Sequence, residues 1–364
     1  MCDVPALRFP EFTGEWKSVH LEDVAEFQKK RISSDLLNNN NYISTENILQ
    51  NFEGIQYSSS IPTNTNVIEY QKGDILLSNI RPYLKKVWFS DRKGGCSADV
   101  FVLRGDKCDQ HFLYYVIASD RFINYVMSGV KGVKMPRGDK NQMKKYAFSI
   151  PTNTEQRKIA KFLSMLDERI KLQNKIIEKL ETLIKGIRNN IMSKIKGDCI
   201  TLQDIADIYQ PQTIASTDLT EDGYLVYGAN GIIGKYHSFN HEKEQICITC
   251  RGNTCGTVNF TEPKSWITGN AMVINTDNYA KNVNKRYLFH YLSSINFNSI
   301  ISGSGQPQIV RQPLAKLKLI LPVLIIQNRI AECLDAMFAK MKNEQSFLQI
   351  LQIQKSCLLS QMFI

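Results

Sequence analysis

Two loops carry the side chains with the clearest chemistry in this sequence. The first, SGVKGVKMPRGDKNQMKKY, begins at Ser128 and holds six cations against one acid, Asp139. The second, SGSGQPQIVRQPLAKLK, begins at Ser302 and carries glutamines and an arginine at corresponding places. Lys and Arg neutralise phosphates, and Arg or Gln can hydrogen-bond guanine or adenine edges in the major groove. Glycines let the backbone come close to a surface, so both loops have the composition that reading bases requires.

Three shorter stretches add candidates of the same kind. They are an early basic cluster after LEDVAEF, the stretch NIRPYLKK, and CRGNT, which follows a strand equivalent to the one before NIRPYLKK. A basic loop is also common as plain solvated surface, so the prediction depends on the loops occurring twice. The predicted DNA-contacting residues are Lys29, Arg31, Arg81, Lys85, Lys131, Lys134, Arg137, Lys140, Gln210, Gln212, Arg251, Asn253, Gln306, Gln308 and Arg311.

The composition is that of a folded chain attracted to polyanions. With 364 residues, 43% of them apolar, we expect two or more domains, and the formal charge of +10 favours nucleic acid or an acidic membrane face. The longest apolar run, LILPVLII, is too short to cross a bilayer, and the first residues do not resemble a signal peptide. We therefore expect a cytoplasmic protein without membrane contact, whose nine cysteines are unpaired.

A search for catalytic chemistry is negative. GANGIIGKY, from Gly228, spaces its glycines one residue too far apart for a phosphate loop and predicts a turn between strands. His237, His241, Cys247 and Cys250 have the spacing of zinc ligands, but alternation along a strand puts the two cysteines on opposite faces. There is no Asn-Pro-Pro or Asp-Pro-Pro tetrapeptide motif and no Gly-rich cofactor loop, so we expect no metal, no cofactor and no catalysis by this chain.

The elements that position these loops occur twice. IPTNTEQRKIAKFLSMLDERI begins at Ile150 and LPVLIIQNRIAECLDAMFAKM begins at Leu321, 171 residues later. The same offset relates the strands DILLSN and QICITC, and SADVFVLR and TGNAMVIN. Near the start it grows by about ten, where LEDVAEF matches LQDIADI, as loop insertions would cause. One offset that fits strand, loop and helix together indicates an internal duplication.

Each copy consists of a globular domain followed by a long helix. The domains mix short strands, among them KVWFS and TVNF, with amphipathic helices predicted over 111–127 and 285–301, which is α+β in character. The two domains match in the order and spacing of their elements and differ in their loop residues, which suggests the same function on different targets. The predicted boundaries are 14–150, 151–197, 198–321 and 322–364.

The long helices have the pattern of a coiled coil. The first is predicted to begin with Thr154 as N-cap, and its apolar positions step by three and four. The predicted seams are Ile159, Leu163, Leu166, Ile170, Gln173, Ile177, Leu180, Ile184, Ile187 and Ile191, and Ile330, Leu334, Met337, Met341, Glu344, Leu348, Leu351, Lys355, Leu358 and Met362. Connectivity favours an antiparallel pair within one chain, while pairing with a second chain stays open.

Polar residues interrupt the predicted seam at matching places. Gln173 and Glu344 lie near the helix midpoints, where an antiparallel pair with a pseudo-two-fold axis would bring them face to face and fix the register. Lys355 weakens the second seam, so the last turns of that helix are expected to fray or to need a partner. Over about forty residues such helices would form a spacer of roughly 60 Å.

At this point the sequence resembles the DNA-specificity subunits of Type I restriction-modification systems. The resemblance rests on LRFPEFTGEWKSVHLEDVAEF, on the repeated Pro and Gln motif, and on the alternation of variable domain and long helix along the whole chain. It implies two target-recognition domains, each reading half of a bipartite asymmetric DNA site, held apart by an antiparallel coiled coil. It further implies docking of two methyltransferase subunits and of restriction subunits, with the methyl donor held by the partner.

Two rival interpretations stay open at the level of sequence. One is a coiled-coil scaffold that binds RNA or a protein partner through its basic loops. The other is a self-contained nuclease or methyltransferase with degenerate motifs. Salt titration of DNA binding separates the first rival, because phosphate contacts give a steep negative slope. Incubation of the chain alone with DNA, metal, ATP and methyl donor tests the second.

Overall fold

The computed structural model describes residues 4–57, 60–130, 135–229, 231–303 and 305–363. The chain divides into two compact units, each described on its own below. Unit 1 comprises residues 1–173 and 347–364, and unit 2 comprises residues 174–346. Two long helices, α5 (Asn153–Lys194) and α8 (Leu324–Met362), contribute one part to each unit.

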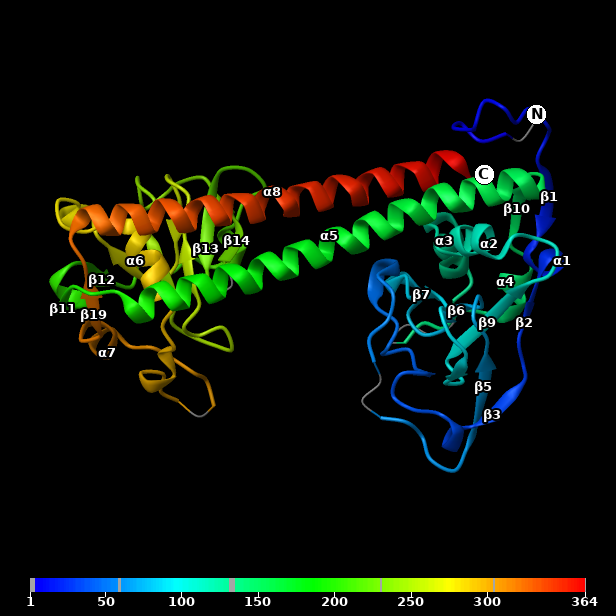
Figure 1. The fold of residues 1–364 in the computed structure, drawn as a ribbon, viewed down its shortest axis with the longest axis horizontal. Coiled ribbons are helices and arrows are strands. Elements are labelled where there is room, and N and C mark those ends of the chain that lie inside the picture. Colours follow the sequence, from blue (N-terminus) through cyan, green and yellow to red (C-terminus); the bar gives the residue numbers. More distant parts are fainter. Residues whose placement is uncertain (1–3, 58–59, 131–134, 230, 304, 364) are drawn as a thin grey trace. The chain divides into compact units, whose positions relative to one another are not determined.

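Unit 1 places two four-stranded sheets beneath a layer of helices (Figure 1). The sheet orders are β2-β9-β6-β7 and β3-β5-β8-β4, and β1 pairs with β10. The strands are β1 (Lys17–His20), β2 (Ala25–Phe27), β3 (Arg31–Ser33), β4 (Tyr42–Ile43), β5 (Asn66–Tyr70), β6 (Ile75–Ser78), β7 (Val87–Phe89), β8 (Gly94–Cys96), β9 (Val100–Gly105) and β10 (Ala147–Ile150). The helices are α1 (Leu21–Val24), α2 (Gln110–Ile117), α3 (Asp120–Ser128) and α4 (Lys140–Lys144), with short 3-10 turns η1 (Ser34–Leu36), η2 (Gln50–Phe52) and η3 (Pro82–Leu84).

Unit 2 repeats the first sheet and the separate strand pair, and its second sheet has three strands in a different order. Its sheets run β12-β18-β15-β16 and β14-β13-β17, and β11 pairs with β19. The strands are β11 (Asp198–Thr201), β12 (Asp207–Tyr209), β13 (Tyr224–Gly228), β14 (Gly231–Tyr236), β15 (Ile246–Thr249), β16 (Val258–Phe260), β17 (Trp266–Ile267), β18 (Ala271–Asn275) and β19 (Lys318–Leu321). The helices are α6 (Lys285–Leu292) and α7 (Arg311–Ala315), with η4 (Leu202–Asp204), η5 (Ser216–Asp218), η6 (Asp277–Tyr279) and η7 (Phe297–Ser299).

The strand registers confirm the predicted duplication. In unit 1 Ile75 pairs with Leu103, and in unit 2 Ile246 pairs with Ile274, which is the same pair moved by 171 residues. The parallel pairs β4·β8 and β13·β17 also correspond, but the second sheets differ otherwise. In unit 1 β5 pairs with β8, whereas in unit 2 β14 pairs with β13. The fold is therefore α+β, and the two domains share the topology of the first sheet and of the strand pair β1·β10 and β11·β19.

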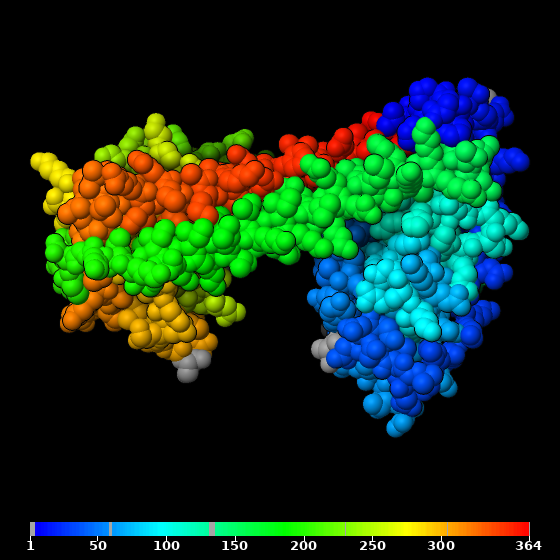
Figure 2. All heavy atoms as spheres, viewed as in Figure 1, coloured from blue at the N-terminus to red at the C-terminus, as the bar shows by residue number. Residues whose placement is uncertain are grey.

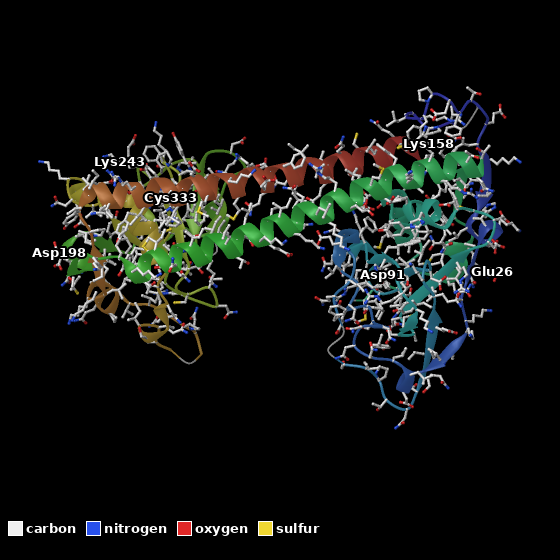
Figure 3. The ribbon with its side chains drawn as sticks, in the orientation of Figure 1. Glu26, Asp91, Lys158, Asp198, Lys243 and Cys333 are labelled. Carbon is white, nitrogen blue, oxygen red and sulfur yellow. The ribbon has the colours of Figure 1, made fainter. Side chains whose placement is uncertain are left out.

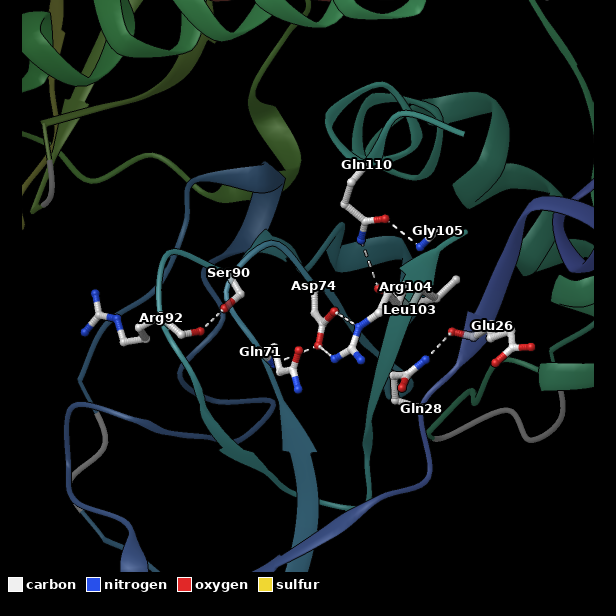
Figure 4. Close-up of polar contacts among 10 residues, drawn as sticks. All are labelled: Glu26, Gln28, Gln71, Asp74, Ser90, Arg92, Leu103, Arg104, Gly105 and Gln110. Carbon is white, nitrogen blue, oxygen red and sulfur yellow. Dashed lines mark hydrogen bonds and ion pairs between the residues drawn. The ribbon is translucent and has the colours of Figure 1, made fainter. Parts of the chain in front are cut away.

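A partly buried ion pair joins β9 to the residue before β6 in the first sheet of unit 1. Arg104 donates two hydrogen bonds of 2.7 Å to the carboxylate of Asp74, whose side chain is 2% exposed, and Gln71 N–H donates to the same group (Figure 4). Gln110, in the first turn of α2, accepts from Gly105 N–H and donates to Leu103 O. These contacts fix the start of β6 and the end of β9 against each other and against the helical layer.

Within each unit α5 and α8 pair in antiparallel fashion. In unit 1 Asp167 contacts Lys355 at 2.5 Å, and further along α5 the guanidinium of Arg169 lies over the ring of Phe347. In unit 2 the last turns of α5 pack with the first turns of α8 in one apolar cluster. All twenty predicted seam positions are buried or half-buried, so the predicted coiled coil is confirmed.

The repeated Pro and Gln motif anchors the first turn of each long helix to its domain. Buried Gln156 accepts from Asp109 N–H at 2.8 Å and donates to Pro151 O at 2.9 Å. Gln327 repeats this with Asn284 N–H and Pro322 O, both at 2.8 Å. The sequence repeat is thus a repeated hydrogen-bonding device that satisfies otherwise unpaired backbone groups.

The predicted ends of three helices were wrong. Thr152, not Thr154, caps α5, because its hydroxyl accepts from Glu155 N–H and its carbonyl from Gln156 N–H. The helix predicted over 111–127 is two helices, since the Ser119 side chain caps a new one at Phe122 N–H. The one predicted over 285–301 ends at Leu292, and only the turn η7 follows.

The C-terminal end of α8 is covered within unit 1, contrary to the expectation that it needs a partner. Lys355 in the seam is paired with Asp167, and Phe363 packs on Phe112 with ring centroids 5.2 Å apart. The N-terminal segment lies over α5 and this end of α8, where Leu7 N–H donates to Gln361 O and Arg8 binds Glu155 (Figure 2). In the same segment Phe9 and Phe12 lie under the ammonium of Lys158. Figure 3 labels Lys158 near this end of α5.

The structure describes the polar seam residues Gln173 and Glu344, but it does not test the prediction that they face each other. Gln173, 3% exposed, is the last α5 residue of unit 1. Glu344 belongs to unit 2, where it is half-buried and forms an ion pair with Lys340 one turn earlier. That the two face each other stays a prediction.

Candidate nucleic-acid interface

In unit 1 the predicted contact residues lie on three segments, the second and third of which are joined by backbone hydrogen bonds. The segments are 28–31 after β2, 79–85 after β6, and 135–140 before α4. Arg81 N–H donates to Pro136 O at 2.8 Å, and Gly138 N–H donates to Asn79 O at 3.1 Å. Ile80 and Arg137 form an isolated antiparallel bridge. The two loops predicted from NIRPYLKK and SGVKGVKMPRGDK therefore lie side by side at the end of β6.

Lys140 connects the first segment to the third. Its ammonium lies over the Phe27 ring at 4.6 Å and near Phe101 at 5.7 Å. Burial lowers the pKa of Lys140, and the nearby charges of Lys29 and Lys144 lower that pKa further. A cluster of like charges held this close favours an anionic ligand.

Carboxylates from elsewhere in the chain partly neutralise this surface. Arg137 binds Asp99 at 2.9 Å, and Lys85 binds Asp120 at 2.6 Å. The sequence showed only Asp139 as a local counter-charge, and that residue accepts backbone hydrogen bonds as the N-cap of α4. A ligand must therefore compete with two ion pairs that sequence proximity does not reveal.

The remaining candidates in unit 1 differ in their surroundings. Arg81 and Lys29 are exposed. Arg31 is exposed too, with a long 3.4 Å contact to Asn66 O. Lys131 and Lys134 lie outside the described residues.

Unit 2 assembles its candidates from the equivalent three segments. These are 209–213, 250–256 and 305–311. Gly252 N–H donates to Pro307 O at 3.0 Å, and Ile309 N–H donates to Cys250 O at 3.0 Å. Gln210 donates to Gly269 O and contacts the Cys250 sulfur, both at 3.2 Å. The two units therefore build the same backbone frame.

The frame shows which side chains are equivalent. Arg251 and Gln308 form the bridge that Ile80 and Arg137 form in unit 1, so Gln308 is the counterpart of Arg137. Arg311 occupies the place of Lys140, and its Nε donates to Ile208 O at 2.7 Å. Arg311 is thus partly engaged in holding β12. The other predicted residues of unit 2, Gln212, Asn253 and Gln306, are exposed.

One residue of this surface was missed from the sequence. Tyr83 lies between Arg81 and Lys85 on the 79–85 loop and is 48% exposed. The sequence signal is an aromatic residue inside the basic stretch NIRPYLKK. Exposed aromatic side chains beside cations are common on nucleic-acid-binding surfaces.

The residues considered for zinc have other structural roles. Cys247 packs in one apolar cluster and Cys250 in another, which agrees with the predicted alternation. His241 is 7% exposed, and both its ring nitrogens are engaged, one with Tyr209 Oη at 2.9 Å and one with Asn240 Oδ1. Among the described residues, no group of three or more His, Cys, Asp or Glu could hold a metal ion.

Two other sequence features have plain structural outcomes. In GANGIIGKY, Gly228 at the end of β13 pairs with Gly231 at the start of β14, as a turn between strands requires, and Asn230 lies outside the described residues. None of the described helices has an apolar stretch of the length that spanning a bilayer requires.

Comparisons with known proteins agree with this architecture. A family model described as Type I restriction modification DNA specificity domain matches residues 13–182 and again residues 198–352. The EcoprrI specificity subunit, a Type I restriction enzyme component of Escherichia coli, is 28% identical over 169 residues, or 45% of this chain and 41% of that protein. A putative type I restriction enzyme specificity subunit of Haemophilus influenzae, S.HindORF215P, is 28% identical over 116 residues, covering 31% and 29%. The aligned stretches span less than half of each relative.

Solved structures extend the likeness to the whole chain at the level of fold. The S subunit of a Type-I restriction-modification system from M. genitalium matches with a TM-score of 0.67 at 17% identity, covering 99% of both chains. A chain solved in work on assembly and conformational transition of the type I R-M system matches with a TM-score of 0.58 at 18% identity, covering 94% and 96%. With two tandem matches that include most of its residues, the chain belongs to the family of Type I restriction modification DNA specificity domains.

Proposed function

We propose that this chain is the sequence-specific DNA-recognition subunit of a Type I restriction-modification complex and does no catalysis itself. The observation that carries the proposal is the three-segment frame, which occurs once in each unit with different side chains. Arg137 in one frame is Gln308 in the other, and Lys140 is Arg311. Arg favours guanine and Gln favours adenine in the major groove, so two such frames would read different sequences.

On this proposal the DNA site is bipartite and asymmetric. Each unit would contact a few base pairs, with cations on phosphates fixing the register and the forked side chains discriminating bases. Unit 1 carries the larger share of cations among the predicted contacts, so we expect its half-site to contribute more of the salt dependence.

The same proposal assigns the outer face of the helices to two methyltransferase subunits, with restriction subunits joining that core. In unit 1, α5 exposes Met165 and Leu172, at 60% and 56%, while α8 exposes Ile350 and Ile353, at 59% and 69%. These residues lie off the buried seam, and their spacing of seven on α5 suits a partner helix. The methyl donor would belong to the methyltransferase.

Mapping of methylated sites tests the proposal directly. Cells that lack other methylation systems would express this chain with its methyltransferase, and the genome would be read for modified bases. We expect one motif made of two defined parts around an unspecified gap. The absence of modification, or a single continuous motif, would contradict the bipartite assignment.

The scaffold alternative predicts a different salt response. Phosphate contacts make the logarithm of the DNA association constant fall steeply with the logarithm of salt concentration, whereas an apolar protein interface does not. A flat slope with duplex DNA, together with tighter binding to RNA, would favour the scaffold. Turnover by the purified chain alone, in the presence of DNA, metal, ATP and methyl donor, would contradict the non-catalytic assignment.

A further inference from the structure

The loop between β6 and β7 holds two cations in an unusual backbone conformation. Arg81 has φ 50° and ψ 63°, and Lys85 has φ 54° and ψ 43°, on either side of the turn Pro82–Leu84. This left-handed region is unfavourable for any residue with a Cβ atom, and basic residues are not enriched in it. A less strained sequence for this loop would place glycine at both positions.

Unit 2 has that glycine sequence. The residues 171 positions later are Gly252, with φ 84°, and Gly256, with φ 91°. At Gly252 nothing lies within 4 Å of an added Cβ, so space alone does not require glycine there. Both units therefore need positive φ at the same two places, and only unit 1 meets that need with charged side chains.

The strained loop is hydrogen-bonded within itself and to neighbouring segments. Arg81 N–H is bound to Pro136 O, Lys85 N–H to Pro82 O at 2.9 Å, and the Lys85 side chain to Asp120. Lys85 O accepts from Phe52 N–H at 3.0 Å, and Phe52 itself has φ 63°. Four of the six non-glycine residues with positive φ in the described chain lie at this place, the fourth being Asn51. Strain concentrated in one well-supported loop is typical of functional sites.

Tyr83 occupies the apex of this loop. Pro82 before it is buried, while Tyr83 is 48% exposed and has no hydrogen bond or ring contact with the described residues. Its counterpart in unit 2 is Thr254. An aromatic ring presented in this way can pack on the thymine methyl group or wedge between base pairs.

We propose that residues 81–85 are a preorganised base-reading loop of unit 1, in which Tyr83 contacts bases and Arg81 anchors the loop on the DNA. This rests on the proposed DNA-recognition function and adds a specificity-determining residue to it. The strain persists because glycine at position 81 cannot supply the anchoring charge. Because the loop is already ordered without DNA, binding loses little conformational entropy.

The experiment separates binding from folding by means of a glycine substitution. Arg81→Gly relieves the backbone, so the Tm of the full chain should stay the same or rise by up to about 3 °C. Its affinity for a duplex carrying the mapped motif, measured in complex with the methyltransferase, should fall roughly 10-fold to 100-fold. Lys264→Gly is the matched control, because Lys264 is an exposed cation with φ 50° in unit 2, away from all three segments. It should show the same direction of Tm change and unchanged affinity.

Tyr83 is tested through the motif itself. Tyr83→Ala should relax the methylation motif at one or two positions of one half only, while Tyr83→Phe should keep the motif, because the contact is apolar. A parallel loss of Tm and affinity in Arg81→Gly would show a structural role and overturn the inference, as would an intact motif in Tyr83→Ala. If the wild-type complex methylates no motif, the proposed function fails and takes this inference with it.

Discussion

At the scale of single residues, the bases that each unit reads would depend on side chains at equivalent places in the frame. Arg137→Ala should weaken binding to the full DNA site by about 1 to 3 kcal/mol. The loss should be equally large on DNA in which only the half-site of unit 2 is altered, because Arg137 would contact the half-site of unit 1. Gln308→Ala should act on the other half-site in the same way. Competition assays with duplexes mutated in one half at a time measure both effects. Equal losses on random and cognate DNA would make these residues phosphate contacts instead.

His241 gives unit 2 a pH-dependent stability. Asn240 Oδ1 accepts from Ile267 N–H and can only accept from His241 Nδ1, so Nε2 is left to accept from Tyr209. Burial lowers the pKa of His241 below its ordinary 6.5, so below about pH 6.5 the unfolded chain binds more protons. The stability that neutral His241 contributes to the folded state is present above about pH 6.5 and is lost as the pH falls below it.

Thermal unfolding between about pH 7.5 and 5.5 measures this effect. The Tm of the wild type should fall more steeply toward acid than the Tm of His241→Gln. His290, whose pKa is also lowered by burial, adds a slope of the same sign to both proteins. Identical slopes in wild type and His241→Gln would refute the assignment.

At the scale of elements, the first turn of α5 depends on one buried amide. Gln156→Ala leaves Asp109 N–H and Pro151 O without their partner, which should cost about 2 to 3 kcal/mol of unfolding free energy. Gln354→Ala, on the exposed face of α8, is the matched control and should change little. Chemical denaturation measures both. If Gln156→Ala loses no more free energy of unfolding than Gln354→Ala does, water replaces the amide.

The outer face of the helices can be tested without disturbing the seam. Met165→Gln combined with Leu172→Gln should abolish co-purification of the methyltransferase while leaving Tm nearly unchanged, because both side chains are already exposed. Lys175→Gln, an exposed position on the same helix, serves as the control. Retained co-purification in the double variant would place the docking surface elsewhere.

Sequence periodicity predicted the seam because its buried positions step by three and four, whereas short apolar runs predicted strands such as β6 and β15, which are buried throughout. It missed the break at Ser119, where a short side-chain cap outweighs a continuous apolar pattern. It also missed the pairing of Arg137 with Asp99 and of Lys85 with Asp120, since those carboxylates are distant in sequence and approach only after the sheet has formed. The positive φ of Arg81 has no sequence signal except comparison with Gly252 in the other copy.

At the scale of the whole molecule, the proposed spacing between half-sites depends on helix length. Removing one heptad from each helix, 174–180 from α5 and 337–343 from α8, keeps the seam and shortens each helix by about 10 Å. The preferred gap in the methylation motif should shrink by about 3 base pairs, at 3.4 Å each, with both half-site sequences kept. An unchanged gap would refute the idea that the helices act as a ruler.

The two units differ in how their chain segments are connected. Unit 2 is one uninterrupted stretch, whereas unit 1 is completed by residues 347–364, including Met362 in its core. During synthesis, unit 2 can therefore reach its final structure while unit 1, although translated first, still lacks part of its apolar contacts. A ribosome that stalls before codon 347 would release a chain whose later half is folded and whose earlier half is open to proteases.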